Sequence, residues 1–424
     1  MDRISELPDE LLFRVLSLLP SAKDVVATMV LSKRWQFLWM FVPKIVFDDS
    51  YQDIDYARFS RFVDRSLILH KAPILETLHF KLGKTCGASD IHVWIRAADK
   101  CCVRELVIEI DTSSIVILPR SLYTECSMLV TLKLKNTILV DVSSSVSFPS
   151  LKTLGLLSVK YPSGDFVQRL LSNCPVLKDL RVEQCPGDNV NIFTVKVASL
   201  KSLCLHTSND RVVEDAHGLV IDAPCLEWLD LLDNTGGFCI IENNMPNIVN
   251  AHIDVTYSLP GKIMTSITSV ERLDLCLLTS KDAYPVGSIF CRLVYLKICT
   301  CETEWLNLLM RVLGDSPKLR ALRLERYHAC RASQSRPYWS EPSSVPECVL
   351  SNLETLEWED YEGTEEEKEM AAFILRNGSC LKKVTINPIS TSLLKKLEMI
   401  KDLSFSPRSS PTCRLSFDCC EGDQ

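Results

Sequence analysis

The hexapeptide LEWLDL, residues 226–231, places leucine at its first, fourth and sixth positions. The same spacing, with conservative apolar substitutions, recurs along most of the chain. The units that carry it begin at Leu75, Val103, Leu129, Leu151, Leu177, Leu200, Leu226, Val270, Leu293, Leu319, Leu353 and Leu381. Val270 follows Leu226 by 44 residues, twice 22, so the spacing predicts one degenerate unit at position 248, where IVNAHI stands. The chain therefore carries thirteen copies of one short pattern.

The period of these copies indicates the kind of repeat. Neighbouring units lie about 25 residues apart, within the range of roughly 20–29 residues that is typical of leucine-rich repeats. Each unit supplies a short strand whose alternate side chains point into a core that no single unit can close. We therefore expect the units to stack into a parallel sheet.

The segments between several strands have helical periodicity. In TEWLNLLMRVLGDSP, residues 303–317, Trp305, Leu308, Leu309 and Val312 recur at helical spacing before a Gly and Pro stop. The stretch SGDFVQRLLSNCPV, residues 163–176, has the same character. The repeats therefore predict an α/β solenoid, an irregular horseshoe with a parallel sheet on one side and helices on the other.

A small polar residue stands three positions after the last apolar residue of several units. There the repeat favours Asn or Cys, and we expect the side chain to hydrogen-bond the turning backbone of adjacent units. The residues at this position are Thr137, Cys185, Ser208, Asn234 and Cys301.

A different kind of segment precedes the repeats. In LPDELLFRVLSLLP, residues 7–20, Pro8 suits the first helical position, and acidic residues follow it where the helix dipole favours them. Leu11, Leu12, Val15, Leu16 and Leu19 make one apolar face before Pro20 ends the helix.

Two further short helices are predicted after Pro20. Ser21 and Asp24 have the spacing of a capping box and open the first, and Ser32 caps the second, which places Trp35, Leu38 and Trp39 on one side. About forty residues in three helices cannot close a core around so many large side chains. We therefore expect another chain to cover them.

Two stretches carry a resemblance to a known family. ISELPDELLFRVLSLLPSAKDVVATMVLSKRWQFLWMFVPKIVFDD, residues 4–49, resembles the F-box of the plant F-box/leucine-rich-repeat/FBD proteins. VPECVLSNLETLEWEDYEGTEEEKEMAAFILRNGSCLKKVTINP, residues 345–388, with the later LLKKLEMIKDLSFSPRSSPTCRLSFD, is similar to their FBD module. The resemblance predicts an F-box over residues 1–47, a repeat solenoid over 48–344, an FBD module over 345–417 that caps the solenoid, and a tail over 418–424.

The resemblance implies a substrate receptor of an SCF-type cullin–RING ubiquitin ligase. In this family the F-box docks on a Skp-type adaptor, which connects it to the cullin and RING subunits, and the repeats hold the protein substrate. The receptor itself is not an enzyme and acts by proximity. The residues implied to contact the adaptor are Leu7, Pro8, Leu11, Leu12, Val15, Leu16, Leu19, Val30, Leu31, Trp35, Leu38 and Trp39. Two alternatives stay open: some of these side chains form an internal core, and the protein is a repeat scaffold without ligase function.

The repeat pattern also predicts where a substrate would bind. Non-core positions of successive strands align in rows across the concave face, where aromatic and Arg side chains are favoured binding anchors. The first row holds Trp228, Asn250, Arg272 and Tyr295, and the second holds Asp230, His252, Asp274, Lys297 and Arg323. The alternative is an ordinary solvated face of mixed charge.

Composition argues against two classes of partner. The net charge is −7 and no long run of Lys and Arg occurs, so a nucleic-acid partner is not expected. No stretch approaches the roughly 18–20 apolar residues of a membrane helix. The acidic MDRISELPDE start does not resemble a signal peptide, so we expect an intracellular protein, in the cytoplasm, the nucleus or both.

No motif for catalysis, a metal or a cofactor is found in the sequence. Gly83-Lys-Thr lacks the second glycine of a phosphate-binding loop, because position 78 is Leu. The chain has neither a GxSxG nor an HExxH motif. The 19 cysteines lack the paired CxxC spacing of zinc sites and are interpreted as reduced, mostly buried thiols. We therefore expect no cofactor and no metal.

The C-terminal module has clear local signals. Thr364 and Glu367 form a capping box, and Asn377-Gly378 ends the helix that follows. Asn377-Gly-Ser also has the form of a glycosylation sequon, but the helix-ending interpretation is favoured because no export signal is expected. The acidic run EGTEEEKE, residues 362–369, is interpreted as the solvated start of this helix. Residues 327–347, rich in Ser, Pro and Arg, are predicted to be a loop.

Overall fold

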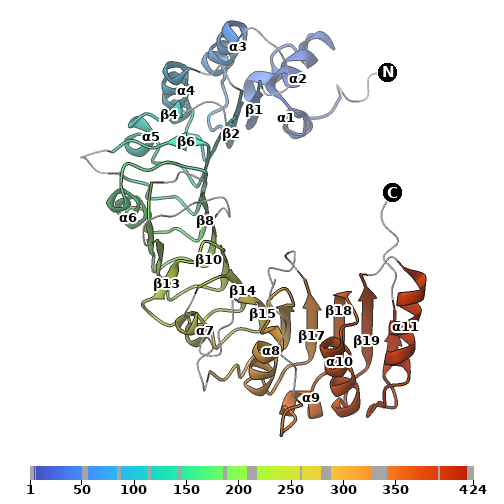
Figure 1. Cartoon of the computed structure of the whole chain (residues 1–424). Coiled ribbons are helices and arrows are strands. Elements are labelled where there is room, and N and C mark those ends of the chain that lie inside the picture. Colours follow the sequence, from blue (N-terminus) through green and yellow to red (C-terminus); the bar gives the residue numbers. More distant parts are fainter. Residues whose placement is uncertain are drawn as a thin grey trace. The chain divides into compact units, whose positions relative to one another are not determined.

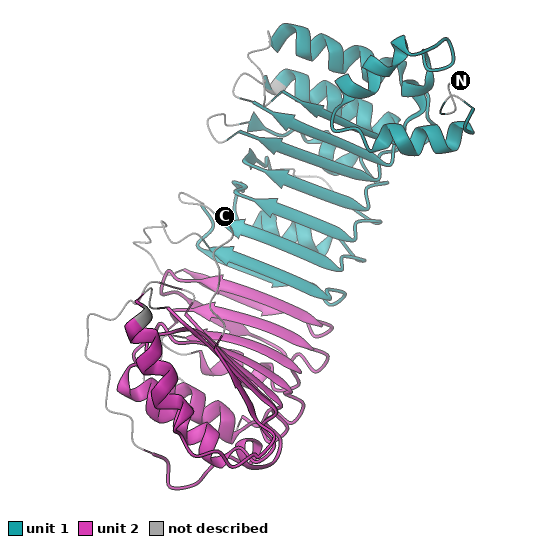
Figure 2. Cartoon of the chain, turned by 90° about the vertical axis from the view of Figure 1, so that its right-hand side faces the viewer, with its two compact units in different colours: residues 1–216 teal, residues 217–424 magenta. Residues whose placement is uncertain are grey.

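A computed structural model provides the structure of the chain. It describes residues 6–49, 56–83, 87–111, 116–141, 146–184, 189–207, 217–257, 260–277, 288–326, 341–389 and 392–417, together with Ile4 and His328. These residues form two compact units, 1–216 and 217–424, shown in different colours in Figure 2. Each unit is a parallel sheet with helices on one side.

Unit 1 begins with short helices and continues as a sheet. Its helices are α1 (Asp9–Ser17), α2 (Ala22–Ala27), α3 (Tyr56–Leu69), α4 (Ala88–Lys100), α5 (Ser121–Thr124) and α6 (Gly164–Ser172), with the 3₁₀ helices η1 (Thr28–Val30) and η2 (Leu38–Phe41). The main sheet runs in the order β1 (Lys44–Asp48), β2 (Thr77–Leu82), β3 (Glu105–Ile110), β5 (Thr131–Lys135), β7 (Thr153–Leu157), β8 (Asp179–Gln184) and β10 (Ser202–Thr207). The remaining strands are β4 (Val116–Ile117), β6 (Thr137–Ile138) and β9 (Ile192–Lys196).

Unit 2 repeats this arrangement, and its own longest helices lie towards its end. Its main sheet runs in the order β12 (Trp228–Asp233), β14 (Asn250–Val255), β15 (Arg272–Leu277), β16 (Tyr295–Cys299), β17 (Ala321–Glu325), β18 (Thr355–Tyr361), β19 (Lys383–Pro388) and β20 (Arg414–Ser416). Two short strands, β11 (Gly218–Asp222) and β13 (Phe238–Ile241), pair with each other. The helices are α7 (Gly261–Ser266), α8 (Trp305–Gly314), α9 (Glu347–Ser351), α10 (Glu365–Asn377) and α11 (Leu393–Ser404). Figure 1 shows α8 and α10 on one side of this sheet, as it shows α4 and α6 in unit 1.

The thirteen predicted repeats are confirmed as thirteen strands, from β2 to β19. Each strand begins at the third residue of its unit; β12, for example, begins at Trp228 in the unit that starts at Leu226. The degenerate unit at position 248 forms β14 in the same way. Within β12, Leu229 and Leu231 are fully buried while Trp228 is exposed, which is the alternation that a sheet with one covered face requires.

The third predicted helix of the N-terminal segment is wrong. Residues after Ser32 form turns followed by η2, because the backbone bonds span three residues: the Trp35 amide donates to the Ser32 carbonyl, and the Met40 amide to the Phe37 carbonyl. Aromatic side chains also have low helix propensity, which favours this tighter path. The preceding helices, α1 and α2, are confirmed, with Ser21 accepting a hydrogen bond from the Asp24 amide at 3.4 Å.

The expectation that another chain must cover the tryptophans is also wrong. Trp35 is 4% exposed and Trp39 is 8% exposed within this chain. Trp39 shares a small apolar pocket with Val25 of α2, Ile45 of β1 and Ser66 of α3. The first strand and helix after the segment therefore complete its core, which forty residues alone could not do.

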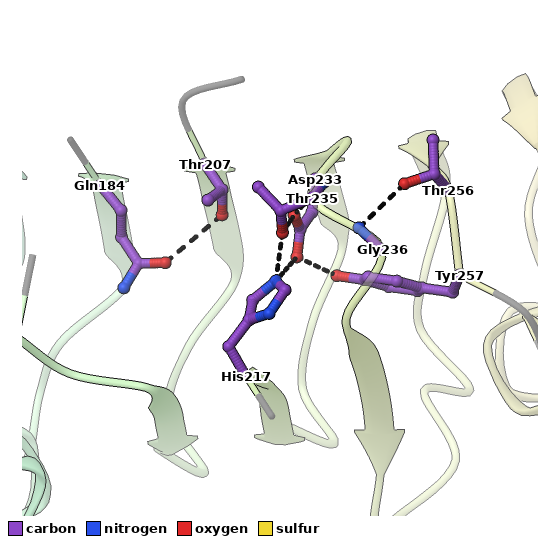
Figure 3. Close-up of polar contacts among 8 residues, drawn as sticks. All are labelled: Gln184, Thr207, His217, Asp233, Thr235, Gly236, Thr256 and Tyr257. Atoms are coloured by element: carbon purple, nitrogen blue, oxygen red, sulfur yellow. Dashed lines mark hydrogen bonds and ion pairs between the residues drawn. The ribbon is translucent and has the colours of Figure 1, made fainter. Parts of the chain in front are cut away.

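The polar contacts along the strand ends lie one residue earlier than predicted. Asn136 Nδ2 donates to the Ile110 carbonyl at 2.7 Å, and Thr207 Oγ1 donates to Gln184 Oε1 at 3.3 Å (Figure 3). Both stand two positions after the last apolar residue. Thr207 ends β10 and is buried, as strand alternation requires, whereas Asn136 follows the end of β5 with a positive φ and is half-buried. Among the described residues, the buried Thr137 hydroxyl and Asn234 amide have no hydrogen-bond partner, while Cys185 and Ser208 lie outside the described residues.

In unit 2 this position holds Asp233, which is buried at the centre of a polar network (Figure 3). Asp233 Oδ2 accepts from the Tyr257 hydroxyl at 2.7 Å, and Oδ1 accepts from the amide and hydroxyl of Thr235 at 3.1 and 2.5 Å. His217 contacts the Thr235 hydroxyl in turn. Each hydrogen bond offsets part of the cost of burying the carboxylate.

The predicted capping box and helix end near the C-terminus are confirmed, whereas the acidic run over residues 362–369 is only partly solvated, since Glu367 is buried. Most of the predicted loop over residues 327–347 lies outside the described residues. Thr364 accepts from the Glu367 amide at 3.4 Å, and the Glu367 carboxylate accepts from the Thr364 amide at 3.2 Å, so the capping box opens α10. The same carboxylate also accepts from the amides of Glu362 and Gly363, which explains why this glutamate is buried. The helix ends at Asn377, and β19 and β20 follow it as the last strands of the sheet.

Candidate functional site

Helix α1 is apolar on two sides. Leu12 and Leu16 are buried against the rest of unit 1, whereas Leu11, Val15 and Leu18 are exposed. Residues three and four apart share one face of a helix, so these exposed side chains form a single stripe. The one apolar face predicted from the sequence is thus divided into an inner stripe and an outer stripe.

A second exposed apolar segment lies near the start of α1. Val30 is 87% exposed and Leu31 is 61% exposed. Arg34 Nη2 donates to the Leu7 carbonyl and to Asp9 Oδ1, both at 2.6 Å, so the segment after η1 lies beside the first turn of α1. These two segments give the N-terminal part of unit 1 an uncovered apolar surface, which we call the F-box surface and define as Pro8, Leu11, Val15, Leu18, Val30 and Leu31.

The twelve side chains implied to contact an adaptor divide into three groups. The exposed ones are Pro8, Leu11, Val15, Val30 and Leu31. The half-buried ones are Leu7 and Leu19, and the buried ones are Leu12, Leu16, Trp35, Leu38 and Trp39. The buried group has little surface to offer a partner, so it stabilises the segment that presents the exposed group.

Two exposed apolar side chains of this region, one of them within the F-box surface, were not predicted. Leu18 is 84% exposed, and Phe37 is exposed next to the buried tryptophans. Leu18 follows Leu11 and Val15 at seven and three residues, a helical spacing that the sequence already contains. The prediction of one apolar face for α1 did not include Leu18.

In unit 2 the predicted rows are confirmed as neighbours across the sheet. The parallel registers pair Trp228 with Asn250, Asn250 with Arg272, and Arg272 with Tyr295. The second row, Asp230, His252, Asp274, Lys297 and Arg323, is paired in the same way. Eight of the nine residues in the two rows, all except Asp230, line one open groove of about 390 Å³ on the strand face away from the buried leucines. They are Trp228, Asn250, His252, Arg272, Asp274, Tyr295, Lys297 and Arg323.

The first row presents a stacked cation. The Arg272 guanidinium lies 4.2 Å from the centre of the Tyr295 ring, which is the geometry of a cation–π contact. Burial, followed by the charge of Asp274, raises the pKa of Tyr295, so the hydroxyl stays protonated at neutral pH. Trp228 and Arg272 are both exposed at this end of the groove.

The second row is held by ion pairs. His252 Nδ1 lies 2.8 Å from Asp230 Oδ1, and this hydrogen bond raises the pKa of His252 against the opposing effect of burial. Arg323 reaches three carboxylates, Glu325 at 2.9 Å, Glu357 at 3.3 Å and Glu359 at 3.6 Å.

Glu325 is shared between two cations, since Lys297 also lies 3.0 Å from it. Burial opposes the ionisation of Glu325, but the bonds with Lys297 and Arg323 prevail and lower its pKa. The groove is therefore a polar surface whose charged groups are already oriented by one another, and it is suited to recognition by hydrogen bonds and charge. None of the helices in the described ranges is long and apolar enough to cross a membrane.

Comparison with known proteins places these regions in a family. The F-box domain family matches residues 4–46 and the FBD family matches residues 341–386. A family described as the LRR repeats of FBD-associated F-box protein At5g56370 matches residues 91–251.

Whole-chain relatives agree with these matches. The chain is 63% identical over 423 residues to the probable FBD-associated F-box protein At1g32375 of Arabidopsis thaliana, covering 99% of this chain and 100% of that protein. It is 50% identical over 421 residues to the F-box/FBD/LRR-repeat protein At5g56420 of the same plant, covering 98% of this chain and 99% of that protein. The chain therefore belongs to the FBD-associated F-box proteins, a plant family.

Proposed function

We propose that this protein is the substrate-receptor subunit of an SCF-type cullin–RING ubiquitin ligase. The F-box surface carries the proposal, because it leaves apolar side chains in water on a segment that matches the F-box domain family. Burying such side chains against a partner is favourable by roughly 1.5–3 kcal/mol for each fully covered leucine or valine. A Skp-type adaptor is the partner that an F-box implies, and through it the cullin and RING subunits.

The receptor has no chemical step of its own in this proposal. It holds a protein substrate near the ubiquitin-carrying enzyme and so raises the effective concentration of the target lysine. The adaptor would cover the exposed residues Pro8, Leu11, Val15, Val30 and Leu31, while the buried tryptophans keep the segment in shape. Because the buried residues support the fold of the segment, variants that test the interface should be made at the exposed positions.

The test is formation of a complex between the full chain and a Skp-type adaptor. We expect a stable one-to-one heterodimer on size-exclusion chromatography, lost when Leu11, Val15 and Leu31 are all changed to Ala. Leu394→Ala is the control, because Leu394 is an exposed leucine on α11, outside the F-box. Failure of the unmutated chain to bind would favour a repeat scaffold without ligase function.

We further propose that the groove of unit 2 contacts the substrate. Its Trp228, Arg272 and Tyr295 are the residue types that dominate protein–protein binding energies. In cells, proximity labelling should recover a set of proteins with the unmutated chain that is lost with the triple Ala variant at these positions. Arg292→Ala is the control, because Arg292 is exposed but pairs with Glu271 outside the groove. Unchanged labelling by the triple variant would contradict the groove as a substrate site.

We also propose that the protein acts inside the cell, in the cytoplasm or nucleus, where its ligase partners would be found. A fluorescent fusion expressed in plant cells tests this. Exclusive signal in the secretory pathway would contradict it.

A further inference from the structure

Three cysteines of unit 2 share one buried site. Eight of the fourteen described cysteines are buried, and three of these, Cys276, Cys299 and Cys301, have sulfur atoms that all lie within 4.8 Å of one another. The sulfur atoms of Cys276 and Cys301 are 3.5 Å apart. A close group of three thiols is a donor set for a soft divalent cation.

The fold explains why these residues meet. Cys276 lies near the carboxyl end of β15, Cys299 is the last residue of β16, and Cys301 follows two residues later. Adjacent parallel strands end at the same edge of the sheet, so residues more than twenty positions apart become neighbours. The spacing rule for zinc motifs considers ligands presented by one turn, and it cannot detect a site assembled from two repeats.

A buried carboxylate lies beside the thiols. Asp254, near the end of β14, is 3% exposed, and its donor atom lies within 4.8 Å of Cys276 and of His328. One oxygen, Oδ2, is 2.8 Å from His328 Nε2, and the other, Oδ1, is buried without a hydrogen-bond partner among the described residues. A buried carboxylate oxygen without a partner is costly and indicates a missing ligand.

We propose that unit 2 binds one zinc ion through Cys276, Cys299 and Cys301, with Asp254 as the fourth ligand and His328 orienting the Asp254 carboxylate. Zinc–sulfur bonds of about 2.3 Å in a tetrahedron separate the sulfur atoms by about 3.8 Å, close to the Cys276–Cys301 distance. Carboxylates that ligate a metal are themselves commonly held by hydrogen bonds, as His328 holds Asp254 here. The ion would tie the ends of β14, β15 and β16 together.

Binding zinc displaces the thiol protons. Each thiolate that forms releases a proton to solvent, so the affinity for zinc should rise with pH. The site offers no open coordination position, so its role is to stabilise the fold.

The test uses the full chain, loaded with ZnCl₂ under reducing conditions and then dialysed. We expect one zinc per chain by elemental analysis, and a tetrahedral thiolate spectrum when Co²⁺ replaces zinc. These three thiols are buried in the metal-free chain as well, so their alkylation reports local opening: bound zinc should slow the reaction in the unmutated chain, and chelation should restore the faster rate. This measurement needs no variant and so does not depend on how variants fold.

Variants then assign the ligands. Cys299→Ser and Cys301→Ser should each lose stoichiometric zinc, and Asp254→Asn should weaken binding at least tenfold. Cys348→Ser should retain it, because Cys348 is an equally buried thiol that donates only to the Leu313 carbonyl. The proposal would be overturned by an unmutated chain without stoichiometric zinc, by zinc retained in Cys301→Ser, or by a Cys276–Cys301 disulfide in the chain isolated under reducing conditions.

Discussion

The F-box surface of unit 1 and the groove of unit 2 expose opposite kinds of side chain. On the F-box surface, Leu18 and Val30 are almost fully exposed to water, and neither side chain has a polar group that needs a hydrogen-bond partner. In the groove, Arg323 and His252 are already paired with carboxylates. Burying the first surface is favourable by the hydrophobic effect alone, whereas binding to the second must exchange existing contacts for new ones.

This difference implies two kinds of recognition within one chain. An apolar surface gains free energy with any partner of matching shape, so it would suit the adaptor proposed above. A polar groove gains little unless the charges and donors of the partner match its own, so it suits discrimination among substrates. The predictions below test the two surfaces against each other.

The largest expected effect separates the inner from the outer face of the F-box segment. Trp39→Ala should destabilise this segment by about 3–5 kcal/mol, because the indole is buried in its core. Leu31→Ala should change stability by less than about 0.5 kcal/mol, because Leu31 faces water. Hydrogen–deuterium exchange over residues 9–48 reports this region by itself. Equal protection in the two variants would contradict the division into inner and outer faces.

Adaptor affinity should show the next largest effect. Leu11→Ala and Val15→Ala should each weaken binding about tenfold, or about 1.4 kcal/mol, by removing apolar area that the adaptor would cover. Because the contacts are apolar, the affinity should change little when salt is raised to about 0.5 M. Biolayer interferometry with the unmutated chain and with Leu394→Ala supplies the reference. A steep loss of affinity with salt would show that charge dominates this interface.

Much of the fold could be predicted from the sequence because the repeats are local patterns. Leucine spacing located thirteen of the twenty described strands, including the degenerate β14, and strand alternation then aligned the groove residues from Trp228 to Arg323. These inferences depend on a period of two and on the similarity of neighbouring units. Both can be read along the chain without knowledge of distant contacts.

The features that sequence reasoning missed depend on contacts between distant residues. Trp39 is covered by β1, at the end of the F-box match, and by α3 after it, so its burial could not be deduced from the three helical segments alone. Asp233 contacts Tyr257, and Cys276 contacts Cys301, only because successive strands end at one edge. Predicting the contacts that join the strand ends therefore requires the register of the sheet as well as the pattern of each repeat.

Within the groove, Arg323 should have the larger effect on stability. Arg323→Gln removes the positive charge that faces the carboxylates of Glu325, Glu357 and Glu359. Because this network is partly exposed, the loss should lower the free energy of unfolding by about 1 kcal/mol at pH 7. The lowered pKa of Glu325 contributes stability above its unfolded pKa, and this contribution is lost as the pH falls through the folded value. The variant and the unmutated chain should therefore converge towards pH 4. Hydrogen-exchange protection of residues 321–361 measures the local stability of the variant and of the unmutated chain at each pH. A stability difference between them that grows in acid would contradict the network.

The smallest expected effect concerns the pair His252 and Asp230. The hydrogen bond with Asp230 raises the pKa of His252, so the stability it contributes is fully present below the unfolded pKa, about 6.5, and is lost as the pH rises through the higher folded value. Asp230→Asn should therefore cost more at pH 6 than at pH 8, and less than about 1 kcal/mol, because the imidazole is partly exposed. NMR of the chain with ¹³C-labelled histidine follows the titration directly, and His252→Gln assigns the resonance among the seven histidines. A His252 pKa that is unchanged by Asp230→Asn would mean that the second row of the groove is not organised by this pair, and the contrast with the F-box surface would be weaker at that end.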